Sequence, residues 1–490
     1  MKTIKNKIYK FLALLPFCVF LSGCDVLEQE PQSILAIESF YSTGSEAEMG
    51  LVGVYNRFFS ENHIVGTFMI LDISSDDLTT PPPRFGYLIE NREEMSSLNH
   101  DGTEAYFRAP WVTIANVNLF IEKVSELPPT AFVGATTAND NRKDEILGEA
   151  YFIRGVSYYY LAMLWRNVPL ILEFPEGPLP QDNQVPNSTQ EQVLAQAKAD
   201  LIMAESLLPD VLIQFTPNER RGRASKAAAN AYLSRFALME SNWQSVVDMS
   251  NVILSNSQYK LVDPWTRLFL NEQNSDEAIL EIQAERSPGF FNMGIHGWFY
   301  GGGQFKATQD AVDQFEKPLK DARYEFTIRD NNNSSKFLPV PLWADAGIER
   351  ANLTMIRLAE IYFNKAEALN ELDYETNKQE VLDILNDIRA RAADPAFQNR
   401  LRPAAPVGTA GIPPLTLAEL DTQDKMRQAI RAEKRRELMF EGQRWLDLLR
   451  WDPAYAVDIV NTSDPDRLYL PIPENEITFN NGVLSQNPGW

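Results

Sequence analysis

One stretch near the C-terminus constrains the fold of this chain more than any other. Residues 427–451 read RQAIRAEKRRELMFEGQRWLDLLRW, with no proline inside and Pro453 just beyond the end. Apolar residues recur there at the spacing of one helix face, which predicts a single helix of roughly six to seven turns. The apolar set is Met426, Ile430, Leu438, Trp445, Leu448 and Leu449.

The charges on this predicted helix are unusual, because three acids lie four residues apart and share one face: Glu433, Glu437 and Glu441. Such like charges repel by a few tenths of a kcal/mol per pair unless cations intervene. A solvated face is the ordinary interpretation, but Phe440 and Trp445 interrupt the charges. We therefore predict a partly buried helix whose Arg and Glu side chains bond to neighbouring helices and loops. Gly442 indicates close approach of another backbone.

The same stretch resembles the C-terminal signature of the SusD/RagB family, E-x-R-x-E-[LF]-x-F-E-G-x-R-[WY]-x-D-[LI]-x-R-W. Two further family markers have counterparts here, in residues 145–171 (EILGEAYFIRGVSYYYLAMLWRNVPLI) and from Arg357 to Ala392. Gly155 stands where the second marker usually has Ala, which is expected only to weaken the helix slightly. The resemblance implies a scaffold of helices packed like tetratricopeptide repeats (TPR-like).

Helical periodicity predicts most of the remaining elements. The predicted helices are 39–60, 106–127, 144–165, 189–208, 224–240, 243–255, 355–372 and 376–393, with a short strand at 278–283 and a loop at 70–83. The aromatic row Tyr158–Tyr160 is interpreted as core. The predicted fold is mainly α, a TPR-like helical-repeat scaffold with long loops and a few short strands. One domain is expected over 24–490, with helices roughly at 106–256 and 353–451 and loop-rich parts roughly at 61–105 and 285–350.

The N-terminus predicts export and lipidation. Four Lys precede an apolar run from Phe11 to Leu21, which is too short to span a bilayer but fits a signal peptide over residues 1–23. Leu21-Ser22-Gly23-Cys24 then resembles a lipobox, so Cys24 is the predicted lipidation site and the only membrane attachment. The alternative is an ordinary signal peptide with an incidental Cys. Cys18 is the only other cysteine, so no disulfide is expected in the mature chain.

Charge restricts the partners. The formal net charge of −22 argues against nucleic acid and against anionic lipid surfaces, because both would repel the chain. A neutral ligand such as a glycan would not be repelled.

A glycan needs aromatic rings for its CH faces and polar groups for its hydroxyls. Asp76–Arg92 and Phe290–Phe305 offer both in loop-like sequence, and a third loop carries Trp343. The candidate ligand-binding residues are Arg84, Tyr87, Trp298, Tyr300 and Trp343. The alternative is that these loops pack on a partner protein or on each other, since exposed aromatic residues also mark interfaces.

No catalytic motif is apparent: the chain has no H-E-x-x-H, no G-x-S-x-G and no Walker loop. Three acids in the 70–83 loop, Asp72, Asp76 and Asp77, are interpreted as solvated loop acids and helix caps rather than catalytic groups. A structural calcium ion at Asp72–Asp77 stays open, and no cofactor is expected.

The family resemblance implies a function in polysaccharide utilization and nutrient uptake. It implies a non-enzymatic lipoprotein on the outer membrane, facing the cell exterior, that binds oligosaccharide or another nutrient. It also implies delivery to a SusC-like TonB-dependent transporter. Two alternatives remain: a surface glycoside hydrolase, and a structural helical-repeat lipoprotein that assembles surface complexes.

Overall fold

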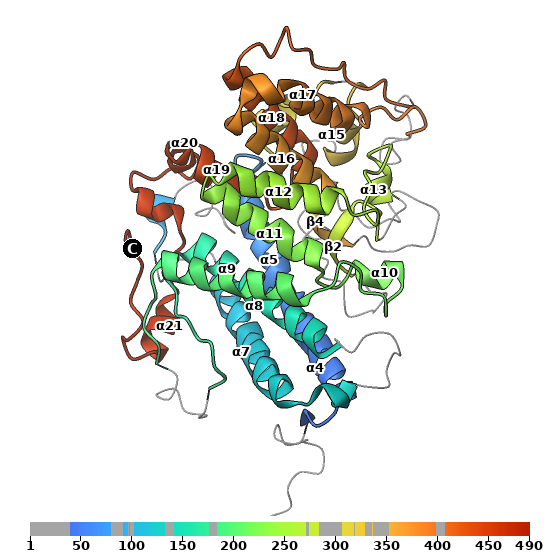
Figure 1. Cartoon of the computed structure of the whole chain (residues 1–490). Helices are drawn as coiled ribbons and strands as arrows, with labels where there is room; N and C mark the ends of the chain where they lie inside the picture. Colours follow the sequence, from blue (N-terminus) through green and yellow to red (C-terminus); the bar gives the residue numbers. More distant parts are fainter. Residues whose placement is uncertain are drawn as a thin grey trace, which may run out of the picture.

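The structure is a computed structural model that describes residues 40–79, 92–96, 98, 102–132, 142–175, 184–270, 274–283, 306–317, 319–328, 336, 352–397 and 407–490. Over these residues it is built mainly from helices that pack as successive antiparallel neighbours (Figure 1). The mainly α class with few short strands is thereby confirmed. No helix within these ranges is long and apolar enough to cross a membrane.

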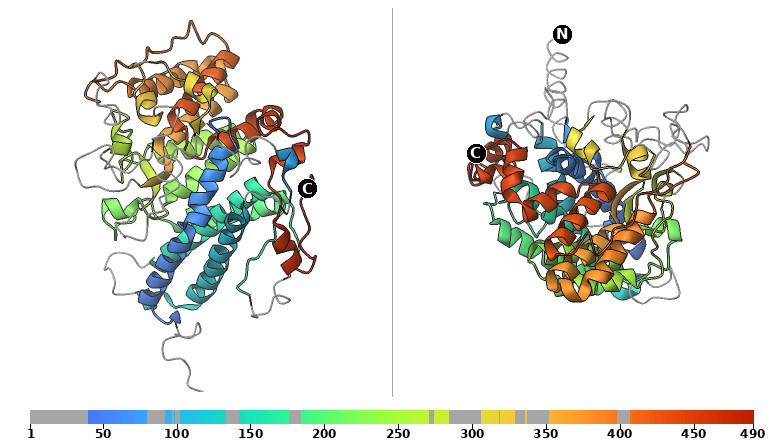
Figure 2. Two further views of the ribbon diagram at one scale, coloured as in Figure 1. Left: turned by 180° about the vertical axis from the view of Figure 1, so that it is seen from behind. Right: turned by 90° about the horizontal axis from the view of Figure 1, so that it is seen from above.

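The N-terminal half forms one end of the molecule. Its elements are α4 (Gly44–Phe58), the π-helical turn η1 (Glu61–Val65), α5 (Gly66–Ile73), α7 (Glu104–Glu126), η3 (Pro129–Phe132), α8 (Arg142–Trp165) and α9 (Gln190–Leu207). The helices α4 and α5 follow one another as a nearly continuous rod, which Figure 2 shows from behind. The helix α8 packs against α4, α7 and α9, and its residues from Glu145 onward are almost all buried. A helix buried on all sides needs no amphipathic face, which explains the weak periodicity of its sequence.

The middle and C-terminal elements continue the stack. They are α10 (Pro217–Arg220), α11 (Lys226–Met239), α12 (Trp243–Leu254), α13 (Arg267–Leu270), α14 (Gln309–Asp313), α15 (Ala322–Thr327), α16 (Leu358–Leu372), α17 (Tyr374–Ala390), α18 (Gln423–Leu438), α19 (Arg444–Trp451), α20 (Pro453–Ile459), η8 (Pro465–Leu468) and α21 (Glu474–Phe479). The hairpin α11–α12 packs on α9 and α16, and α16 packs on α17 and α18. After α20 the chain returns along the flank of the N-terminal half (Figure 1), where Leu470 N donates to Leu164 O (2.7 Å).

Two small antiparallel ribbons complete the described part. One pairs β1 (Leu78–Thr79) with β3 (Lys306–Ala307), and the other pairs β2 (Ala278–Ile282) with β4 (Leu353–Arg357). The short strand at 278–283 is therefore confirmed. The residues Met355–Arg357, which were predicted to begin a helix, belong instead to β4, because Ile356 pairs with Leu280 and the whole strand is buried.

The prediction of one continuous helix over 427–451 was wrong. The helix α18 ends at Leu438 and α19 begins at Arg444, and between them Phe440 (φ 63°) and Gly442 (φ 70°) adopt left-handed backbone. The break is held by long-range contacts. Lys336 Nζ donates to Glu437 O (2.9 Å) and to Met439 O (3.0 Å), which satisfies carbonyls that a helix end leaves without partners.

Gly442 confirms the expected close approach of another element. Its N–H donates to Asp72 Oδ1 (2.8 Å), and a Cβ there would lie 3.2 Å from the ring of Phe68. Gly155 has a similar role that the sequence did not indicate. A Cβ at Gly155 would lie 2.9 Å from Ala197 O, so the glycine permits α8 and α9 to pack closely.

Two other sequence predictions can be compared directly. The row Tyr158–Tyr160 is buried, as predicted for core. The loop expected over 70–83 was wrong in its first part, because Ile70–Ile73 form the last turn of α5. That turn continues the buried apolar run Phe68–Leu71, all of it inside the core.

Candidate functional site

The five predicted ligand-binding residues, Arg84, Tyr87, Trp298, Tyr300 and Trp343, and the predicted lipidation site Cys24 all lie outside the described residues. What the structure describes are the ends of the three segments that carry the five candidates. These segments are residues 80–91 (the first segment), 284–305 (the second segment) and 337–351 (the third segment).

One ribbon joins the first segment to the second. In it Leu78 pairs with Ala307 and Thr79 pairs with Lys306. Beyond the pairing, Thr308 N donates to Asp77 O (2.9 Å) and Thr308 Oγ1 donates to Asp76 O (2.6 Å). The residue that precedes the first segment therefore lies directly beside the residue that follows the second.

The other ribbon joins the second segment to the third. Ile282 pairs with Leu353, and Asn352 Nδ2 donates to Glu281 Oε2 (2.8 Å) and Gln283 Oε1 (3.4 Å). The start of the second segment and the end of the third are thus neighbours. Each ribbon therefore brings together the ends of two segments that are far apart in sequence.

Buried cations fix the two remaining ends. Arg92, which follows the first segment, is fully buried and donates to Leu468 O (2.7 Å) and Ser74 Oγ (2.7 Å). Burial lowers the pKa of Arg92 to about 9. Lys336, which precedes the third segment, makes its contacts to the α18–α19 turn and pairs with Glu441 (2.5 Å). Burial also lowers the pKa of Lys336, although Glu441 acts in the opposite direction.

The three acids of α18 and the following turn form the centre of a buried ion network, as the sequence predicted. Glu433 pairs with Arg323 (2.7 Å) and Arg389 (2.6 Å). Glu441 pairs with Arg357 (2.7 Å).

Glu437 occupies the middle of this network. Its Oε1 accepts from Arg357 (2.8 Å), Arg391 (2.7 Å) and the indole of Trp265 (2.9 Å), and its Oε2 accepts from Arg323 (3.2 Å). Interleaved cations therefore convert the repulsion of a bare acidic row into mutual attraction.

The network holds its acids ionised. Burial by itself would raise the pKa of Glu433, but Arg323, Arg436 and Arg389 outweigh burial and lower it to about 2. Burial opposes Arg391, Arg357 and Arg323 in the same way at Glu437, whose pKa is also lowered. These groups are charged at neutral pH and compensated, so they support structure and are not poised for proton transfer.

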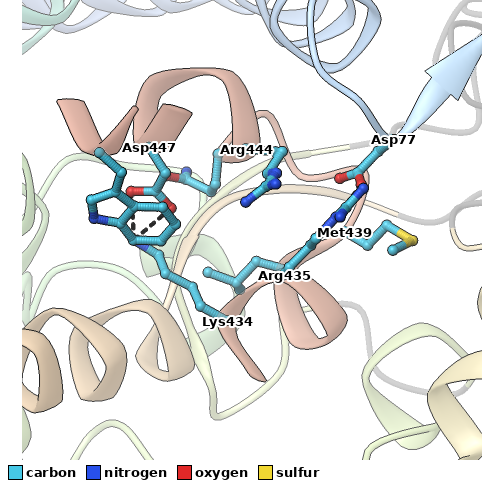
Figure 3. A pocket seen from close by; sticks show the side chains of 9 residues that line it. Asp77, Lys434, Arg435, Met439, Arg444 and Asp447 are labelled. Carbon is cyan, nitrogen blue, oxygen red and sulfur yellow. Dashed lines mark hydrogen bonds and ion pairs between the residues drawn. The ribbon is translucent and has the colours of Figure 1, made fainter. Parts of the chain in front are cut away.

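A second ion cluster lies at the base of the first segment (Figure 3). Arg444 forms a bidentate pair with Asp76 (2.7 and 2.8 Å), and Arg435 pairs with Asp77 (2.7 Å). Figure 3 shows Arg435, Arg444 and Asp77 of this cluster. Arg444 and Arg435 lower the pKa of Asp76 against the opposing effect of burial. The interpretation of these acids as solvated was wrong: Asp72, Asp76 and Asp77 are at most 8% exposed. The arginines that pair with Asp77 and Asp76 lie 358 and 368 positions away in the sequence.

The small hollow inside this cluster holds about 10 Å³ and is lined in part by Asp77, Lys434, Arg435, Arg444 and Asp447 (Figure 3). That volume is about the size needed for one water molecule and excludes a sugar ring. In the described part of the chain, no group of three His, Cys, Asp or Glu residues could hold a metal ion.

Sequence reasoning missed two members of the framework, Arg323 and Lys336. Arg323 is fully buried and forms a pair with Asp321 (2.8 Å), two residues before it. The sequence Asp321-Ala322-Arg323 was the only local signal for this pair, and it does not indicate burial. Lys336 lies in a run of Asn and Ser, where nothing in the composition indicates burial.

Two family models match separate parts of this chain: one described as "Starch-binding associating with outer membrane" over residues 55–238, and one described as "SusD family" over 341–461. Two curated relatives from Formosa agariphila, SusD-like protein P38 and SusD-like protein P2, are each 25% identical. Each match covers 99% of this chain, and 99% and 100% of the relatives.

Solved structures share the fold. A laminarin-binding SusD-like protein superposes with a TM-score of 0.69 at 21% identity, covering 91% of this chain and 100% of the other. Surface glycan-binding protein A from Bacteroides fluxus gives 0.68 at 19% identity, with 91% and 100% covered. A SusD superfamily protein from Bacteroides thetaiotaomicron gives 0.70 at 20% identity, with 91% and 99% covered.

Proposed function

Because this chain belongs to the SusD family, we propose that it captures oligosaccharide at the cell surface and delivers it to a TonB-dependent outer-membrane transporter. The predicted signal peptide over 1–23, lipidation at Cys24 and a single folded unit over 24–490 belong to the same proposal. The relatives named for laminarin and for surface glycan binding support the ligand class.

The single observation that carries the proposal is the pairwise joining of the segment ends by two ribbons. The ribbon β1–β3 pairs the residues before the first segment with those after the second, and β2–β4 pairs the residues before the second segment with those after the third. Buried Arg92 and Lys336 fix the two remaining ends. Loops on a rigid base can present rings and amides to a ligand without losing much conformational entropy on binding. We propose that Arg84, Tyr87, Trp298, Tyr300 and Trp343 make these contacts.

We also propose that the chain binds its ligand without catalysing a reaction on it. Arginines hold Glu433 and Glu437 ionised. Burial raises the pKa of Asp72 and of Glu281, but both side chains are at most 3% exposed and lie in no accessible cleft among the described residues. A glycosidase needs one carboxylic acid kept protonated near neutral pH beside a second carboxylate in an accessible cleft.

Isothermal titration with a panel of laminari-, malto-, xylo- and manno-oligosaccharides tests binding. We expect at least one series to bind, and expect Tyr87→Ala and Trp298→Ala each to weaken binding at least tenfold, or about 1.4 kcal/mol. Phe479→Ala is the matched control, because Phe479 is 62% exposed on α21, an element remote from the three segments in sequence.

Each outcome distinguishes the alternatives. Unchanged affinity in both loop variants would place the ligand elsewhere, and no binding by any series would favour a purely structural assembly role. Release of shorter sugars from the panel, abolished by a single carboxylate change, would favour a hydrolase.

Anchoring and handover are tested in cells. We expect Cys24→Ala to release the chain from the outer membrane, and a tagged wild-type chain to co-purify with a TonB-dependent transporter. Membrane retention of the Cys24→Ala variant would refute the lipid anchor.

A further inference from the structure

A larger hollow lies on the helical scaffold itself. It is bounded by the N-terminal end of α11, the C-terminal end of α12 and the connection after α9, and it encloses about 340 Å³. The two hollows beside α19 enclose only about 10 and 20 Å³. A volume of a few hundred Å³ lies within the range of small-molecule sites.

Asn230 supplies an unused hydrogen-bonding group to this hollow. Its side chain is only 7% exposed, it lines the hollow, and it makes no hydrogen bond to any residue that the structure describes. A primary amide offers two donor hydrogens and two acceptor lone pairs. Asn230 is not among the described residues whose side-chain polar atoms are both shielded from solvent and without a partner, so its amide is accessible from the hollow and can bond to what enters it.

The remaining lining combines polar and apolar groups. Lys226, Asn256 and Ser257 line it with polar side chains, while Ala227 and Ile253 provide an apolar wall. Asn256 Oδ1 accepts from Gln258 N (3.1 Å), which fixes the orientation of that amide. The described lining holds no aromatic side chain, so a sugar here would be held mainly by hydrogen bonds to its hydroxyls, with the apolar wall against one CH face.

The charges favour a neutral ligand. Lys226 faces Glu205 at 3.6 Å and shares the hollow with Asp210, so its charge is locally compensated. The formal net charge of the chain is −22, which disfavours phosphate or sulfated sugars.

We propose that this hollow is a second saccharide subsite, which takes one neutral sugar residue and hydrogen-bonds its hydroxyls through Asn230. It rests on the proposed function only for the class of ligand, since none of its residues belongs to the three segments. A polymer held at two places on one chain dissociates more slowly than one held at a single place, because release of one contact leaves the other bound.

Saturation-transfer NMR on the mature chain tests the subsite, with the methyl glycosides of glucose, galactose, mannose and xylose as probes. A Trp298→Ala, Tyr300→Ala double variant serves as the background that removes the proposed loop site. In this background we expect at least one glycoside still to receive saturation. Asn230→Leu should weaken that binding about tenfold, through loss of hydrogen bonds to the sugar.

Ser257→Tyr keeps the test decisive if Asn230→Leu does not fold. Ser257 is exposed at the rim of the hollow, so a tyrosine there obstructs entry without altering the core. Ser125→Tyr, at an exposed position on α7, is the matched control and should leave saturation transfer unchanged.

Two results would overturn the subsite: no saturation of any glycoside in the loop-variant background, or equal saturation in Ser257→Tyr and Ser125→Tyr. Either leaves the proposed function intact, because that function is judged by oligosaccharide titration of the loop variants. Failure of the loop variants to lose oligosaccharide binding would leave the subsite test unaffected, because Ser257→Tyr reports on the hollow alone.

Discussion

Replacement of Glu437 by glutamine tests whether the buried ion network carries the stability of the C-terminal half. Glu437 is fully buried and accepts hydrogen bonds from Arg323, Arg357, Arg391 and Trp265. Glutamine preserves the shape but removes the charge. It also turns one acceptor oxygen into an NH₂ donor that must face a donor.

The expected cost is large because three guanidinium groups lose their common counter-ion. Removing one partner of a buried ion pair costs about 3–5 kcal/mol, since the opposing charge is left uncompensated. A chain of this size has an unfolding entropy of roughly 1 kcal/mol/K at its midpoint, so Glu437→Gln should lower Tm by about 3–5 °C. Differential scanning calorimetry at pH 7 measures the shift.

Glu380→Gln is the matched control, with the same chemistry on the surface. Glu380 is 51% exposed and pairs with Lys365 at 2.8 Å. An exposed pair of this kind contributes at most about 1 kcal/mol, so Tm should fall by no more than about 1 °C. Equal shifts in the two variants would refute the reasoning that burial makes the network important.

Three further predictions follow from the same contacts. Glu433→Gln should cost on the order of 3 kcal/mol above pH 4.5, because the pKa of the folded state, about 2, lies below the ordinary value. The difference from wild type should shrink in urea titrations as the pH falls from 4.5 toward 2, and a constant difference would contradict it. Gly442→Ala should lower the free energy of unfolding by about 1–2 kcal/mol, measured by thermal unfolding, because alanine disfavours left-handed backbone. This loss should exceed that of Gly482→Ala, because Gly482 also has left-handed backbone but an added Cβ there would meet nothing within 4 Å. Equal losses would argue against close packing at Gly442. Asp76→Asn should weaken oligosaccharide binding several-fold in titration, because Arg444 then holds the base of the first segment less firmly; unchanged affinity would disconnect this base from the ligand.

Local signals in the sequence were enough for most helices. Capping boxes begin two of these helices, Thr43 with Glu46 at α4 and Thr189 with Gln192 at α9. Each box joins residues only three positions apart. Helix periodicity and capping depend on residues three or four positions apart, so the sequence carries them directly. The prediction that the charged stretch is buried and paired succeeded for a related reason, since aromatic residues among the charges left no fully solvated face.

Long-range contacts decided what the sequence could not. The break between α18 and α19 depends on Lys336, Arg357 and Asp72, whose positions near Glu437 and Gly442 follow only from the assembled fold. The sequence by itself therefore determined most of the helical segments, the family that they resemble and the residue types available for contacts with a ligand. Only the tertiary structure decided where the long helix breaks, which acids are buried and which loop ends meet. The contacts that stabilise those features join groups that are hundreds of residues apart in sequence, so no local pattern predicts them.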